Sequence, residues 1–120
     1  MPRPLKSRQA KWLQETDNLH LTGEVDFSNV ADLLQEGNHW LQHTGQTQCN
    51  LSLAGVTYTN SAGVALIMGL RRTADELNKH FIIRDVPANL LSMTHLGGLD
   101  WLLVSNAAPP HSAAPFTQQQ

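Results

Sequence analysis

The segment that constrains this chain most is Leu51–Ala74, LSLAGVTYTNSAGVALIMGLRRTA, where an alternating pattern passes into a helical one at Asn60-Ser61-Ala62-Gly63. Alternation is typical of a strand with one buried face, and apolar residues three and four apart are typical of an amphipathic helix. A helix that begins directly after a strand leaves free backbone N–H groups and the positive end of its dipole at the junction. Such an end suits an anion, a phosphate or the acceptor groups of a partner. The sequence therefore places the functional site at this junction.

Length and composition indicate one small globular domain. A chain of 120 residues with 41% hydrophobic content can form one core of ordinary size. We expect a flexible N-terminal tail over 1–10, a folded domain over 11–105 and a disordered tail rich in proline, alanine and glutamine over 106–120. The formal charge of −2 provides no basic patch for nucleic acid. Without a signal-like apolar run or a stretch of about 20 apolar residues, the protein is expected to be cytoplasmic.

Hydrophobic periodicity predicts an α/β fold with a mixed sheet of four or five strands and helices packed on one face. The sheet begins with a hairpin around Asp17-Asn18. The last expected element is either a closing strand or the opening of a final helix. The expected segments are strands over Lys11–Glu15 and Leu19–Val25, a helix over 28–44 capped by Ser28, a strand over Cys49–Leu53, a turn region over Gly55–Asn60, a helix over 62–78, a strand over Phe81–Val86, a helix over Ala88–Leu96 and the ambiguous segment Asp100–Val104.

A helical wheel of the second helix divides it into a buried arc and an unusual outer arc. The buried arc, which should lie on the sheet, contains Gly63, Leu66, Leu70, Thr73, Ala74 and Leu77. The outer arc places Val64 and Met68 beside the charged Arg71, Arg72 and Asp75. Apolar residues on a face expected to be wet, close to a helix end rich in donors, are typical of a protein interface.

Ser61 has two interpretations. It either caps the helix by accepting an N–H bond, or its hydroxyl contacts a partner. A nucleotide-binding loop is disfavoured because Gly55–Gly63 has neither the lysine nor the glycine spacing of a Walker motif.

Other reactive residues give weaker signals. Cys49 lies in an alternating run and is expected to face the core rather than act as a nucleophile. His39 and His43 have a spacing of four that can hold zinc, but no third ligand is evident in the sequence, so no metal or other cofactor is expected. Trp12, Trp40 and Trp101 are expected to be packing anchors.

Three motifs in order resemble the STAS domain family. They are L-T-G-E-V-D-F at Leu21–Phe27, the junction G-V-T-Y-T-N-S-A-G-V-A-L-I, and the step V-P-A-N-L at Val86–Leu90. The resemblance covers about Leu13–Val104, and STAS domains occur in bacterial anti-sigma factor antagonists and in the tails of sulfate transporters. It implies a STAS-like α/β fold and a protein without enzymatic activity. In this family Ser61 falls at the serine or threonine that antagonists offer for phosphorylation, whereas Asn60 stands where an aspartate is usual.

Length and the G-E-V-D and N-S-A-G-V-A-L motifs most resemble the small stand-alone STAS subunit of the Mla phospholipid-transport ABC system. This resemblance implies a cytoplasmic accessory subunit, peripheral to the inner membrane, that binds and supports the ATPase subunit. An anti-sigma factor antagonist, phosphorylated at Ser61 by an anti-sigma factor kinase, stays open as the alternative, and an enzyme or small-ligand sensor is a weaker one. Together with the wheel, the resemblance predicts a partner-binding site made of Asn60, Ser61, Ala62, Val64, Met68, Arg71 and Arg72.

Overall fold

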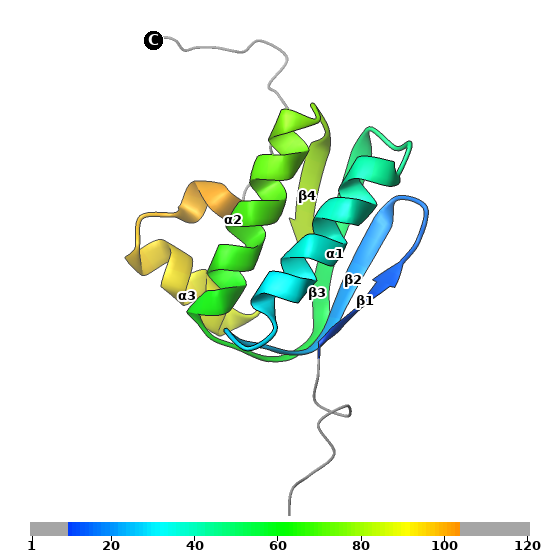
Figure 1. The fold of residues 1–120 in the computed structure, drawn as a ribbon. Helices are drawn as coiled ribbons and strands as arrows, with labels where there is room; N and C mark the ends of the chain where they lie inside the picture. The colour runs from blue at the N-terminus through cyan, green and yellow to red at the C-terminus, as the bar shows by residue number, and fades with distance from the viewer. Residues whose placement is uncertain (1–9, 104–120) are drawn as a thin grey trace, which may run out of the picture.

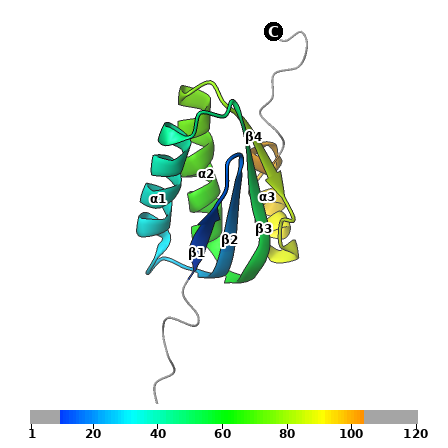
Figure 2. The ribbon, with the colours of Figure 1, turned by 90° about the vertical axis from the view of Figure 1, so that its right-hand side faces the viewer.

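One mixed sheet of four strands organises the computed structural model, which describes residues 10–103 (Figure 1). The elements in chain order are β1 (Lys11–Gln14), β2 (Asn18–Val25), α1 (Val30–His43), β3 (Gln48–Thr59), α2 (Ser61–Glu76), β4 (His80–Arg84), α3 (Ala88–Leu96) and the 3-10 helix η2 (Asp100–Leu103). The strands lie in the order β1-β2-β3-β4, with β1 antiparallel to β2 and the other pairs parallel. Figure 2 shows α1 and α2 side by side over one face of the sheet. The predicted α/β sheet backed by helices is confirmed.

The N-terminal hairpin forms where the sequence predicts it. Lys11 pairs with Thr22, and the backbone N–H of Glu15 donates to the carbonyl of Asn18 at 2.9 Å to close the turn. The predicted tails, 1–10 and 106–120, lie outside the described residues except for Ala10.

The third strand is longer than predicted. The sequence suggests a turn after Leu53, but β3 continues to Thr59. It stays paired with β2 to its end through two register shifts, with Thr22 opposite Gly55 and Val25 opposite Thr59. Gly55 marks a close approach of the two strands rather than a turn, because a Cβ atom there would lie 2.6 Å from Thr22 Cγ2. The β-branched and aromatic residues that follow it favour an extended backbone.

The structure also differs from the prediction at the start of α1, at the end of β4 and in the last segment. Helix α1 begins at Val30 rather than Ser28, because Ser28 donates to the Asp26 side chain instead of capping the helix. Strand β4 ends at Arg84, since Asp85 takes a positive φ of 59° that a strand cannot continue. The ambiguous last segment is a 3-10 helix.

A reciprocal pair of glycine and leucine contacts joins α1 to α2. A Cβ atom on Gly37 of α1 would lie 2.6 Å from Leu70 Cδ2 of α2, and one on Gly69 of α2 would lie 2.6 Å from Leu34 Cδ1 of α1. The glycine of each helix therefore leaves space for a leucine side chain of the other helix. Beneath this contact, the core between the helices and the sheet includes the fully buried Leu21, Leu41, Leu51, Leu66 and Phe81.

This packing predicts that Gly37→Ala destabilises the fold. Alanine is favoured over glycine inside a helix by about 1 kcal/mol. The clash with the buried Leu70 side chain should outweigh that gain and lower the free energy of unfolding by about 1–3 kcal/mol. Urea denaturation followed by circular dichroism measures this change.

Gly45→Ala is the matched control. A Cβ atom added at Gly45 would meet no other atom within 4 Å, and the φ angle of Gly45 is not positive, so alanine there should leave stability unchanged or raise it slightly. An unfolding midpoint for Gly37→Ala equal to that of the unmodified protein would contradict the close helix approach.

Candidate partner-binding site

The junction between β3 and α2 is capped by Asn60. Its side-chain oxygen accepts a hydrogen bond from the backbone N–H of Ala62 at 2.8 Å, and its carbonyl accepts from Gly63 N at 2.9 Å. The interpretation of Ser61 as the cap is therefore wrong. The helix begins at Ser61, and the residue before it has the extended backbone that an N-cap requires.

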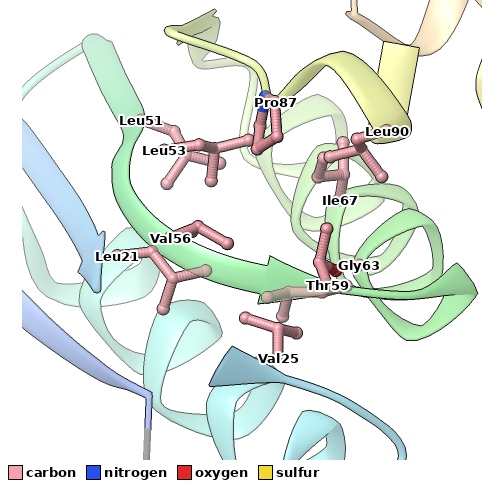
Figure 3. A pocket seen from close by; sticks show the side chains of 11 residues that line it. Leu21, Val25, Leu51, Leu53, Val56, Thr59, Gly63, Ile67, Pro87 and Leu90 are labelled. Carbon is pink, nitrogen blue, oxygen red and sulfur yellow. The ribbon is translucent and has the colours of Figure 1, made fainter. Parts of the chain in front are cut away.

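Packing holds this junction in place from the strand side and from α3. A Cβ atom on Gly63 would lie 2.3 Å from Oγ1 of the buried Thr59, so glycine is needed where the first turn of α2 meets the strand end. Figure 3 shows Thr59, Gly63 and Leu90 converging there. The Asn89 side chain at the start of α3 donates to the Thr59 carbonyl at 2.8 Å. The helix end is thus a fixed surface.

The residues predicted for the site differ in their exposure. Ser61 and Arg72 are exposed, and Asn60 is half-buried. Ala62, by contrast, is 0% exposed, so its side chain belongs to the core. Val64 and Met68 are not on a fully wet face as the wheel predicted, because both are half-buried and pack against the edge of the core.

Arg71, also predicted to meet a partner, binds within the chain. Its Nη1 atom donates to the backbone carbonyls of Trp101 and Leu102 in η2, the latter at 3.1 Å. Its guanidinium carbon lies 5.6 Å from the Trp101 ring centroid, a cation–π distance. The wheel missed this contact because it assumed a single buried side, whereas η2 covers a second side of α2.

The exposed stripe of α2 is therefore narrower than predicted and shifted around the helix. It comprises Ser61, Ala65, Met68 and Arg72, spaced as i, i+4, i+7 and i+11 on one line of the helix. Met68 is its half-buried member, and Ala65 is the residue that sequence reasoning missed. When the core and η2 each cover one side of α2, this stripe is the part of the helix that stays exposed.

Phe27 is a second residue that the sequence analysis missed. Its side chain is 64% exposed in the loop between β2 and α1. Val25 and Thr59 are paired at the ends of β2 and β3, so this loop leaves the sheet beside the α2 junction. Hydrogen bonds from the Ser28 hydroxyl and backbone N–H to the Asp26 carboxylate fix the loop and lower the pKa of Asp26. The signal available in the sequence was a phenylalanine in the loop that follows a predicted strand.

The cysteine and the two helical histidines singled out in the sequence lie away from the α2 junction. Cys49 is 0% exposed, and burial raises the pKa of its thiol, which keeps it protonated and unreactive. The rings of His39 and His43 stack with centroids 4.0 Å apart, and His43 Nδ1 lies 2.8 Å from the His39 carbonyl. Within residues 10–103 no group of three or more potential metal ligands comes together.

The tryptophans have two different environments. Trp12 and Trp40 are packing anchors whose indole N–H groups donate to the carbonyls of Leu33 and Glu15 at 3.0 and 3.2 Å. Trp101 differs from the prediction, since 53% of it is exposed beside α2.

The apolar crevice in Figure 3 is too small for an organic ligand. It lies between β3, the first turns of α2 and the start of α3, where Leu53, Ile67, Pro87 and Leu90 meet. Its cavity volume of about 10 Å³ would hold one water molecule at most. The strand order also follows the chain without the reversal at which ligands bind in open α/β sheets.

In the part of the chain that the structure describes, no helix is both long enough and apolar enough to cross a bilayer.

Comparison with known proteins agrees with this architecture. Two solved structures, the anti-sigma factor antagonist SpoIIAA in its unphosphorylated form and the Bacillus cell fate determinant SpoIIAA in its phosphorylated form, superpose with TM-scores of 0.63 and 0.60. Both are 14% identical to this chain, and the matches cover 80% of it and 86% and 89% of the respective SpoIIAA chains. At that identity the likeness concerns the fold. Residues 9–105 also match the protein family described as Mlab, STAS domain, and because this match spans most of the chain, the protein belongs to the STAS domain family.

Proposed function

We propose that this STAS domain is a non-enzymatic binding protein, the cytoplasmic accessory subunit that docks on the ATPase of an Mla-type phospholipid-transport ABC system. The observation that carries the proposal is the exposed stripe Ser61, Ala65, Met68 and Arg72, which begins at a rigidly held helix end. The family description Mlab supports the same assignment. The subunit would then work at the cytoplasmic side of the inner membrane through its transporter partner.

The chemistry of the stripe suits a protein partner. Ser61 and Ala65 are small, so a partner helix or loop can approach the first two turns of α2 closely. Met68 supplies an adaptable apolar contact and Arg72 a charged one at the rim. Phe27, in the neighbouring loop, adds an exposed aromatic anchor.

Preorganisation of the junction lowers the entropy cost of docking, which helps a small surface to bind its partner. The junction is held by the Asn60 cap, the Thr59–Gly63 contact and the Asn89 hydrogen bond, so little conformational freedom is lost on docking. Docking on the ATPase would hold the nucleotide-binding subunit in one stable, active arrangement.

An anti-sigma factor antagonist is the second candidate. Because Asn60 provides the cap, the exposed Ser61 hydroxyl is not needed for that role and is accessible to a kinase. SpoIIAA, whose fold this chain shares, is known in unphosphorylated and phosphorylated forms. Against this candidate, Asn60 replaces the aspartate that usually stands before the phosphorylated residue.

The two candidates predict different masses for the protein in its own cells. As a transporter subunit it should carry an unmodified Ser61, or only a small phosphorylated fraction. Intact-mass spectrometry of protein purified from its own host, with fragmentation to locate any phosphate, measures this. A dominant species phosphorylated at Ser61 would favour the antagonist over the transporter subunit.

Charge placed on the stripe should abolish docking. Ala65→Glu and Ser61→Glu would each put an unpaired carboxylate into a desolvated contact and weaken binding by about 2–5 kcal/mol. Both sites are exposed, so stability should change by no more than about 0.5 kcal/mol. Co-purification with the tagged ATPase subunit and the melting temperature are the readouts.

Gln35→Glu is the matched control, because it adds the same charge to an exposed position of α1. It should retain the ATPase at the level of the unmodified protein. Retention by all three well-folded variants would exclude the stripe as the docking surface. Failure of the unmodified protein itself to bind the ATPase would exclude the proposed function.

A further inference from the structure

A hollow of about 250 Å³ lies between η2 and the part of α2 that follows its first two turns. We call it the α2–η2 hollow. In Figure 1, η2 is the short orange segment beside α2. Its walls are formed by Met68, Arg72 and Glu76 of α2 and by Trp101 and Leu102 of η2, with Arg71 between the two elements.

The wall contributed by η2 is rigidly attached. Leu102 is 0% exposed and anchors η2 in the core. Arg71 donates to the carbonyls of Trp101 and Leu102 while its guanidinium lies over the Trp101 ring. Trp101 is therefore held in one orientation although 53% of it is exposed. A large aromatic side chain that is fixed before binding is typical of an interface hot spot.

Size and charge define what the hollow can accept. A closed apolar cavity of about 150 Å³ is sufficient for benzene, so this larger hollow has room for one bulky side chain. The positive charges of Arg71 and Arg72 are balanced by the negative charges of Asp75 and Glu76. Because these wall charges cancel, a charged group would gain no net attraction in the hollow, whereas an uncharged group can pack on Met68 and Trp101.

We propose that the α2–η2 hollow receives an uncharged apolar side chain, of the size of leucine, methionine or phenylalanine, from the partner that docks on α2. This inference rests on the proposed function and extends its interface toward the C-terminal half of the helix. The hollow is continuous with the exposed stripe, because Met68 and Arg72 belong to both. Met68 lies about 10 Å along the helix from Ser61, so one partner helix can reach both regions.

The experiment measures the affinity of the full chain for the purified ATPase subunit by isothermal titration calorimetry. Trp101→Ala, which removes one wall, and Glu76→Trp, which fills the hollow, should each raise Kd at least about tenfold. Leu96→Ala is the control, since Leu96 is 86% exposed on α3 and does not line the hollow. It should bind like the unmodified protein. Glu76→Trp removes nothing from the core, so it separates loss of the hollow from loosening of η2.

The outcomes distinguish this inference from the proposed function. If Trp101→Ala and Glu76→Trp bind normally while Ala65→Glu does not, the hollow is not part of the interface and the docking function stands. If the two variants change only the self-association of the protein in sedimentation velocity, a second copy occupies the hollow and the inference is wrong. If deletion of residues 104–120 shifts the Trp101 indole resonance and leaves ATPase affinity unchanged, the chain's own C-terminal segment occupies the hollow, which also overturns the inference.

Discussion

The close approach of α1 and α2 determines where the proposed binding surface lies. Leu70 occupies the space above Gly37, and Leu34 occupies the space above Gly69, so the two helices pack closely against each other. This contact fixes the rotation of α2 about its axis. The buried Leu66, Leu70 and Ala74 then face the core, and the opposite side of the helix must face elsewhere. A different rotation would bury Ser61 and Ala65 and leave no stripe for a partner.

The second constraint on α2 is η2, which binds Arg71 and so turns part of the outer arc of the helix into an intramolecular contact. Arg71 serves the fold here, because a guanidinium that binds carbonyls and covers an indole ring is already committed to its own chain. Arg72, one residue later, points to the exposed side. Of these neighbouring arginines, Arg71 therefore binds within the chain whereas Arg72 is exposed, and this difference follows from the angle of about 100° between successive side chains.

Sequence patterns are sufficient for the order of the elements, the N-terminal hairpin and the bounds of α3, since these depend on local turn chemistry and periodicity. They fail where a residue's role depends on a distant neighbour. Gly55 suggests a turn until β2 is known to lie against it, and Asn60 or Ser61 could each cap α2 until the helix start is known. The wheel places Arg71 on a wet face because the contacts of a 3-10 helix 30 residues away carry no periodic signal. It also misses that Val64 and Met68 pack against the edge of the core. The exposure of the α2 residues is therefore corrected by the structure, and the partner-binding site at this junction stays a prediction.

The choice of asparagine as the cap has a consequence for the kind of recognition this helix end can support. An aspartate at position 60 could accept the same bond from Ala62 N, and its charge would neutralise the positive end of the helix dipole. Asparagine completes the cap without charge, so the dipole remains available to acceptor groups of a partner. An aspartate at position 60 would repel a phosphate on Ser61, whereas the neutral asparagine would not. On a junction held in place by Gly63 and Asn89, the neutral Asn60 cap therefore fits the proposed docking of a partner's acceptor groups at this helix end.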